Sequence, residues 1–318
     1  MKLVELFGGI GAIRKAYINS KLPFEIVDYV EIDKNCVKSY NALYNENYKP
    51  RNICGYSLPD KEIDLLMHGS PCQDFSRVGE KQGGEKGSGT RSSLLFETIR
   101  IIEERQDKPK WVIWENVKGV LDKNMRASFF YYLKEMERLG YETKYEILNS
   151  MDFGIPQKRE RIFAISYLGC NPFNFDNLRH QETKYLSDFL EKDVMEKHGD
   201  IFLVKQTSML KILYDPSYKP QFKGRLQVIE DFCYTISTKQ VRVPNSGILA
   251  IGNNKYRYLT ERECFRLMGF DDSDFDKLIK IFPRRKNCMS SILYKQAGNS
   301  IVVNVLEEII KEIHNCSL

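Results

Sequence analysis

Long apolar runs are absent from this chain of 318 residues. A membrane-spanning helix needs about 20 consecutive apolar residues, and no segment reaches that length. The chain passes from Met1 almost directly into the apolar segment that begins at Leu3, which leaves no room for a signal peptide. We therefore expect a protein without a membrane segment that stays in the cytoplasm.

Closely spaced cysteines are also absent. The eight cysteines form no Cys-x-x-Cys pair, and the chain has only four histidines. Because structural zinc sites need such ligands at short spacing, we expect no bound metal. Isolated cysteines are typical of a reduced, intracellular protein and not of a disulfide framework.

A large excess of either charge is also absent over the whole chain, because 48 Lys and Arg nearly balance 43 Asp and Glu and leave a net charge of only +5. Residues 201–258, however, contain nine Lys and Arg against three acids, a local excess of +6 that leaves the remainder near −1. Such a segment is either a solvated basic face or a surface that binds a polyanion such as nucleic acid.

What the first 166 residues do contain is an alternation of apolar, strand-like runs with helical patterns. Strands are predicted at 2–6, 26–31, 63–68, 111–115, 143–148 and 161–166. Helices are predicted near 10–19, 33–44, 93–106 and 127–138. This alternation predicts an α/β fold with a doubly wound, mostly parallel sheet, whose ligands bind at the carboxyl ends of the strands.

The alternation stops between about residues 167 and 258, where aromatic, Asn, Pro and Lys residues mix without a period. Helical patterns return at 259–270 and 300–314. We expect residues 1–166 together with 259–318 to form one domain, and 167–258 to form a smaller, irregular one.

A glycine-rich turn follows the first predicted strand, with the sequence Phe7-Gly8-Gly9-Ile10-Gly11-Ala12. Glycines there let a ligand approach the backbone, and Glu31, at the end of the second predicted strand, can accept hydrogen bonds from ribose hydroxyls. The turn alone is compatible with a nicotinamide cofactor and with adenosylmethionine.

A candidate nucleophile, Cys72, follows the third predicted strand in the segment Gly69-Ser70-Pro71-Cys72-Gln73-Asp74-Phe75-Ser76. A lone cysteine is more often a small buried hydrophobe, so position alone leaves both interpretations open. The glycine-rich residues 77–92 come next, with the length typical of an active-site lid.

Two further segments carry charged residues next to a predicted strand. One is Trp111-Val112-Ile113-Trp114-Glu115-Asn116-Val117, in which Glu115 could simply cap the next helix. The other has Gln157, Arg159 and Arg161 at alternate positions, which an extended chain places on one face. An exposed ladder of ion pairs is the ordinary alternative for so charged a run.

Together these segments resemble the DNA cytosine carbon-5 methyltransferases of the compact prokaryotic or phage type. The matching segments occur in the family's order and also include Arg262-Glu263-Cys264-Phe265-Arg266-Leu267-Met268-Gly269-Phe270 and Gln296-Ala297-Gly298-Asn299-Ser300-Ile301. In the family the first supports the recognition module and the second closes over the cofactor. The resemblance covers essentially all of the chain except residues 167–258.

The resemblance implies that S-adenosyl-L-methionine is the cofactor and double-stranded DNA the substrate. Cys72 would attack carbon 6 of a flipped-out cytosine, which makes carbon 5 electron-rich enough to accept a methyl group. Glu115 would hydrogen-bond the ring nitrogen and the exocyclic amine, and Arg161 the ring carbonyl, with Arg159 beside the acid.

The resemblance also implies two sets of binding residues. The cofactor set is Phe7, Gly9, Ile10, Gly11, Glu31, Ile32, Asn52, Ile53, Pro71, Leu94, Asn299 and Ile301. The DNA set is Gln73, Ser76, Arg77, Arg225, Lys239 and Arg242. At Asn52 the chain departs from the family, which often has Asp there to hold the adenine amino group.

Other functions are less well supported by the sequence. The branch of the family that acts on tRNA cytosines typically has Pro before Pro-Cys, where this chain has Ser70. A catalytically silent nucleic-acid-binding relative would not need Cys72 and Glu115, and an oxidoreductase fits only the first glycine turn. We expect a monomer that has a cognate restriction endonuclease as a genetic partner; the recognised DNA sequence is not predicted.

Overall fold

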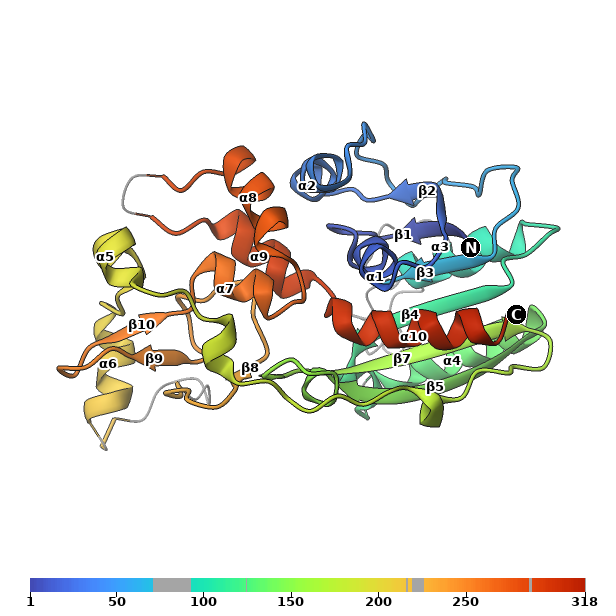
Figure 1. The fold of residues 1–318 in the computed structure, drawn as a ribbon. Helices are drawn as coiled ribbons and strands as arrows, with labels where there is room; N and C mark the ends of the chain where they lie inside the picture. The colour runs from blue at the N-terminus through green and yellow to red at the C-terminus, as the bar shows by residue number, and fades with distance from the viewer. Residues whose placement is uncertain (71–92, 124, 216, 219–225, 286–287, 318) are drawn as a thin grey trace, which may run out of the picture.

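Six strands form a mostly parallel sheet in the order β2-β1-β3-β4-β7-β5 (Figure 1). The computed structural model describes the chain except residues 71–92, 124, 216, 219–225, 286–287 and 318. The strands are β1 (Lys2–Leu6), β2 (Glu25–Val30), β3 (Leu65–His68), β4 (Trp111–Val117), β5 (Tyr141–Asn149) and β7 (Glu160–Leu168). All six predicted strands are therefore present, and the predicted α/β class is confirmed.

The strand β7 is the exception to the parallel arrangement. It runs antiparallel to both of its neighbours, β4 and β5. Its register with β4 pairs Val117 with Arg161 and Glu115 with Phe163. The two segments predicted to carry catalytic charge thus lie on adjacent strands.

Helices cover both faces of the sheet, as a doubly wound fold requires. On one face Leu3, Leu65 and Trp111 share a core with α1 (Ala12–Ser20) and α10 (Val303–Asn315). On the other, the alternate residues Val4, Leu66 and Val112 pack with α3 (Ser93–Glu103) and α4 (Arg126–Arg138). Figure 1 shows α10, near the end of the chain, lying along the sheet beside α1.

After β7 the chain runs back along the sheet, where Phe173, Phe175 and Leu178 join its core, and short elements between residues 194 and 258 then lie at the end of the molecule away from the sheet (Figure 1). They include α5 (Val194–His198), α6 (Thr207–Tyr214), β8 (Cys233–Tyr234), β9 (Ile248–Ala250) and β10 (Tyr256–Tyr258). The last two form an antiparallel pair, and β8 pairs with β6 (Gln157–Lys158). A separate small core holds Val204, Met209, Leu226, Ile248 and Tyr258.

The helix predicted at 259–270 is shorter in the structure. The helix α7 (Glu261–Arg266) begins at a capping box formed by Thr260 and Glu263 and stops before Gly269, whose φ of 84° does not suit a helix. Four described α-helices went unpredicted: α5, α6, α8 (Asp272–Ile281) and α9 (Ser291–Asn299). The capping box of α8, formed by Asp271 and Asp274, is a sequence signal that could have located that helix.

Among the described residues, no helix combines the length and the apolar character needed to cross a membrane.

Candidate active site

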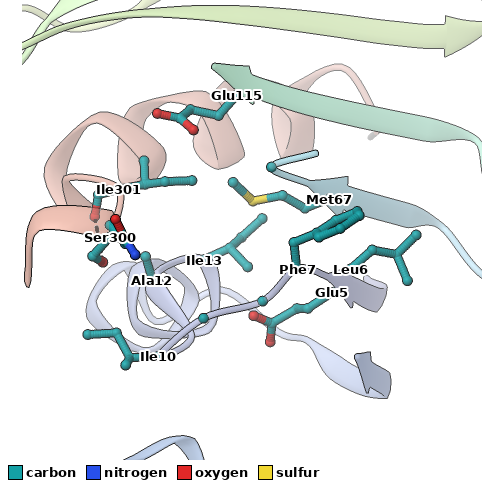
Figure 2. A pocket seen from close by; sticks show the side chains of 14 residues that line it. Glu5, Leu6, Phe7, Ile10, Ala12, Ile13, Met67, Glu115, Ser300 and Ile301 are labelled. Atoms are coloured by element: carbon teal, nitrogen blue, oxygen red, sulfur yellow. Dashed lines mark hydrogen bonds between the residues drawn. The ribbon is translucent and has the colours of Figure 1, made fainter. Parts of the chain in front are cut away.

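A cavity of about 500 Å³ opens at the carboxyl edge of the sheet, where the loops after β1, β2, β3 and β4 meet α9. Its lining includes Phe7, Gly9, Glu31, Gly69, Leu94, Glu115, Arg159, Arg161, Gly298 and Asn299. A smaller cavity of about 100 Å³ shares Phe7, Gly9, Glu115 and Asn299 with it and adds Ile10 and Ile301. Figure 2 shows Glu115 on one side of this smaller cavity and Ile10, Ala12 and Ile13 on the other.

The glycine turn leaves open space at the position a ligand would need. Gly9 has a φ of 55°, and no described atom lies within 4 Å of the place where its Cβ would be. Any side chain there would be strained and would project into that space. Gly11, by contrast, caps α1 and is not among the described residues that line either cavity.

Glu31 follows β2 and is anchored on both carboxylate oxygens. One oxygen accepts the backbone N–H of Gly9 at 3.1 Å, and the other accepts the N–H of Asp33 at 2.8 Å. Burial raises the pKa of Glu31, and these backbone N–H groups oppose that shift. Each oxygen keeps a lone pair for a further donor, so the oriented carboxylate can accept hydroxyl groups.

Five other predicted cofactor residues take different positions relative to the cavities. Leu94 and Asn299 line the larger cavity, and the side chain of Ile32, 65% exposed, follows Glu31 at the surface. Asn52 and Ile53 are not among the described residues that line either cavity. The Asn52 side chain accepts the N–H of Cys54, and Ile53 is buried in the core.

Glu115 and Arg161 form an ion pair at the cavity wall. The Nε atom of Arg161 lies 3.2 Å from a carboxylate oxygen of Glu115, and both side chains are largely buried. Arg161 stands opposite Val117, so it reaches Glu115 diagonally across the two antiparallel strands. Burial raises the pKa of Glu115, although Arg161 and Arg159 oppose that shift.

Arg159 is 3% exposed, which rules out an exposed ladder of ion pairs. Its guanidinium donates to the carbonyl of Ile236 at 3.2 Å, of Gly298 at 3.1 Å and of Ser300 at 2.7 Å. Burial, with a smaller effect of Arg161, lowers the pKa of Arg159 to about 9. The side chain therefore ties the turn at 298–300 to the segment that follows β8.

Residues that the sequence analysis did not single out hold the chain just before Pro71-Cys72. The buried Ser70 carbonyl accepts from Trp114 Nε1 at 3.3 Å and from Asn116 Nδ2 at 3.0 Å, while His68 Nδ1 lies 3.1 Å from its hydroxyl. Burial lowers the pKa of His68 to about 3, so this imidazole is neutral. The sequence signal that could have identified Asn116 was its position next to Glu115.

Several predicted residues lie outside the described part of the chain: Pro71, Cys72, Gln73, Ser76, Arg77, Arg225 and the predicted lid at 77–92. The remaining two DNA residues, Lys239 and Arg242, are exposed and do not belong to the described cavity lining. Their segment is close to the cavity nonetheless. A Cβ on Gly298 would lie 2.6 Å from the backbone of Ser237 and Thr238.

Comparison with known proteins agrees with this geometry. A family model described as C-5 cytosine-specific DNA methylase matches residues 1–315. The chain is 34% identical to the type II methyltransferase M2.ScrFI of Lactococcus lactis subsp. cremoris, with 98% of this chain and 99% of the relative covered. It is 28% identical to the orphan methyltransferase M.SPRI of Bacillus phage SPR, with 98% and 97% covered.

Solved structures support the same fold. The crystal structure of the S. pombe Dnmt2 methyltransferase superposes with a TM-score of 0.79 at 20% identity, over 100% of both chains. The structure of the Entamoeba histolytica methyltransferase EhMeth gives a TM-score of 0.72 at 17% identity, over 100% of this chain and 99% of the other.

Proposed function

The chain belongs to the C-5 cytosine-specific DNA methylase family, and from this premise we propose which of its residues carry out the reaction. The protein is a DNA cytosine carbon-5 methyltransferase, and S-adenosyl-L-methionine is its methyl donor. The observation that best supports our assignment is that Glu115 and Arg161 share one cavity with Gly9 and Glu31. Glu115, Gly9 and Glu31 can therefore contact a target cytosine and a cofactor that are bound in the same cavity.

The residues present fit the cofactor. Glu31 offers an oriented carboxylate to ribose hydroxyls, the space beside Gly9 admits close approach to the backbone, and Asn299 closes the cavity from α9. When bound, the cofactor supplies an electrophilic methyl group. We assign Phe7, Ile10, Leu94 and Ile301 to its apolar contacts, because all four line one or both cavities.

We assign the nucleophile to Cys72, whose thiolate adds to carbon 6 of the target cytosine. Glu115 hydrogen-bonds the ring nitrogen and exocyclic amine, and its raised pKa favours the protonated form that can donate to that nitrogen. Arg161 keeps the Glu115 carboxyl oriented and faces the ring carbonyl. Once carbon 5 carries the methyl group, it loses its proton and the Cys72 thiolate leaves.

We assign the catalytic domain to residues 1–166 with 259–318 and the recognition domain to 167–258. The packing of α10 against α1 and β1 supports this division, and so does the separate core of Val204, Leu226 and Ile248. Exposed Lys239 and Arg242 are available to DNA phosphates or base edges.

We further propose that the enzyme acts as a monomer in the cytoplasm. Its 34% identical relative is a type II methyltransferase, which supports a cognate restriction endonuclease as genetic partner. The tRNA substrate is disfavoured, because the family model that matches residues 1–315 is named for DNA methylation and the relative is named as a type II methyltransferase.

Bisulfite sequencing of DNA from cells that express the protein tests the proposed activity. We expect protected cytosines in a single sequence context, absent from the same cells carrying an empty vector. Protection without a shared context would contradict sequence-specific methylation. Bisulfite sequencing of RNA from the same cells tests the alternative substrate, which protection of tRNA without protection of DNA would favour.

Replacing Glu31 by alanine is expected to weaken cofactor binding by about 1–3 kcal/mol, because hydrogen bonds to a charged acceptor are lost. Calorimetric titration with adenosylhomocysteine measures this loss. Glu25→Ala is the matched control, since Glu25 is exposed at the opposite end of the same strand. Equal affinity in the two variants, or thermal stabilisation by NAD and not by adenosylhomocysteine, would overturn the assignment.

A further inference from the structure

Three tyrosines from β2 and α2 (Lys34–Tyr44) hold the glycine turn from behind. The hydroxyl of Tyr29 donates to the carbonyl of Gly9 at 2.7 Å, and that of Tyr44 to the carbonyl of Gly11 at 2.6 Å. The hydroxyl of Tyr40 donates to Glu5 of β1 at 2.7 Å. We call Tyr29, Tyr40 and Tyr44 the tyrosine clamp.

The rings of the clamp also set where the turn can lie. Tyr29 and Tyr40 stack with centroids 3.8 Å apart, and Tyr44 meets Tyr40 edge-on at 4.9 Å. A Cβ on Gly8 would lie 2.7 Å from the Tyr29 ring, and one on Gly11 would lie 2.6 Å from the Tyr44 ring. The backbone of the turn therefore rests directly on aromatic rings that come from a different part of the chain.

Charged groups complete the cluster. Arg14 of α1 donates to the Tyr40 hydroxyl at 3.2 Å and lies over the Tyr44 ring, 4.7 Å from its centroid. Glu5 is 1% exposed, and one of its oxygens has no hydrogen-bond partner among the described residues. Burial raises the pKa of Glu5 to about 7, although Tyr40 and Arg14 oppose that shift. Tyr40 is therefore the hydrogen-bond donor that this buried carboxyl depends on.

The residue Gly9 connects the clamp to the cavity. Its carbonyl, in the peptide group shared with Ile10, accepts from Tyr29, while its N–H, in the peptide group shared with Gly8, donates to Glu31 at 3.1 Å. Phe7 has a φ of 55°, a conformation that non-glycine residues rarely adopt without support, whereas Gly9 and Gly11 reach positive φ readily because they have no Cβ. If Tyr29 stopped holding the carbonyl, the φ and ψ angles of Gly9 could change, and its N–H could move away from Glu31, which would lose a donor that orients it.

We propose that the tyrosine clamp positions the glycine turn and Glu31 for the cofactor, so that its hydroxyls determine cofactor affinity without touching the cofactor. This role rests on the proposed cofactor site. It predicts an effect on binding that is separate from methyl transfer, because none of the three hydroxyls bonds to Glu115 or Arg161 in the described structure.

Phenylalanine substitutions test the clamp, because they remove the hydroxyl and keep the ring. We expect Tyr29→Phe and Tyr44→Phe each to raise the Kd for adenosylhomocysteine, measured by calorimetry without DNA, by about 3- to 10-fold. The KM for the cofactor should rise in step, while kcat at saturating cofactor stays within about twofold. Amide hydrogen exchange in residues 7–11 should become faster.

Tyr48→Phe is the matched control. The Tyr48 ring packs against Tyr29 and Tyr40, but its hydroxyl makes no hydrogen bond among the described residues. This variant should bind adenosylhomocysteine like the wild type. The proposed role of the clamp would be overturned if the phenylalanine variants lowered the melting temperature but left the Kd and the exchange rates at the values of the control.

Failure of the proposed cofactor site gives a different result. A wild-type protein that does not bind adenosylhomocysteine would overturn that site, and the role of the clamp with it. Wild-type binding combined with unchanged Kd values in Tyr29→Phe and Tyr44→Phe would overturn the clamp alone.

Discussion

Replacing Cys72 by alanine is expected to abolish the covalent complex with DNA that carries 5-fluorocytosine at the target position. The wild-type enzyme should form this complex when S-adenosyl-L-methionine is present, because carbon 5 then holds a fluorine that cannot leave as a proton does. The thiol therefore stays bonded to carbon 6. Without the thiol no such bond can form. Denaturing gel electrophoresis of protein and labelled DNA measures the complex directly.

The chain offers a matched control in Cys54→Ala. Cys54 is an exposed thiol that precedes β3, and its removal should leave the complex intact. Bisulfite protection should disappear with Cys72→Ala and persist with Cys54→Ala. A complex formed as readily by Cys72→Ala as by the wild type would show that another residue is the nucleophile.

Replacing Glu115 by glutamine is expected to lower the rate of methyl transfer by about 10²- to 10⁴-fold, the range for losing a general acid or base. Glutamine keeps nearly the same size, but it cannot give a proton to the ring nitrogen. It also leaves Arg161, which lies 3.2 Å from the carboxylate, without its ion-pair partner. Single-turnover transfer of a tritiated methyl group to target DNA measures the chemical step.

The control for this substitution is Glu160→Gln on the neighbouring strand. Glu160 is half-buried and forms a solvent-accessible ion pair with Lys118, so its replacement should change the rate by less than about twofold. Adenosylhomocysteine affinity and melting temperature should remain near wild type in both variants. If Glu115→Gln lost cofactor binding in proportion to its rate, the role of Glu115 would be structural and not catalytic.

Local patterns of apolar residues were enough to predict many of the strands and helices. Apolar runs such as Trp111–Val117 predict strands because a buried strand needs apolar residues on both faces. The amphipathic pattern near the end of the chain predicts α10, because a helix that packs on a sheet needs apolar residues on one face. The antiparallel position of β7 between β4 and β5 was not predictable, since strand order depends on which distant segments pair.

The functional residues at the strand ends could also be predicted from the sequence. Glu31 and Glu115 were predicted from the sequence, and both line the larger cavity. Asn52 was predicted by its place in the family's motif, but its side chain bonds the N–H of Cys54 and does not belong to the described lining. A motif position specifies where a residue lies along the chain, whereas its side-chain direction depends on the local turn.

Residue types, their order and their periodicity were enough to predict a doubly wound sheet with an acid, two arginines and a glycine turn at its edge. The contacts through which these parts hold one another became visible only in the folded chain. Arg159 bonds carbonyls 77 to 141 residues away, and Tyr29 and Tyr44 bond Gly9 and Gly11 from 20 and 33 residues away. Such contacts leave no periodic trace in the sequence, because a buried donor can satisfy any carbonyl that the packing brings within about 3 Å.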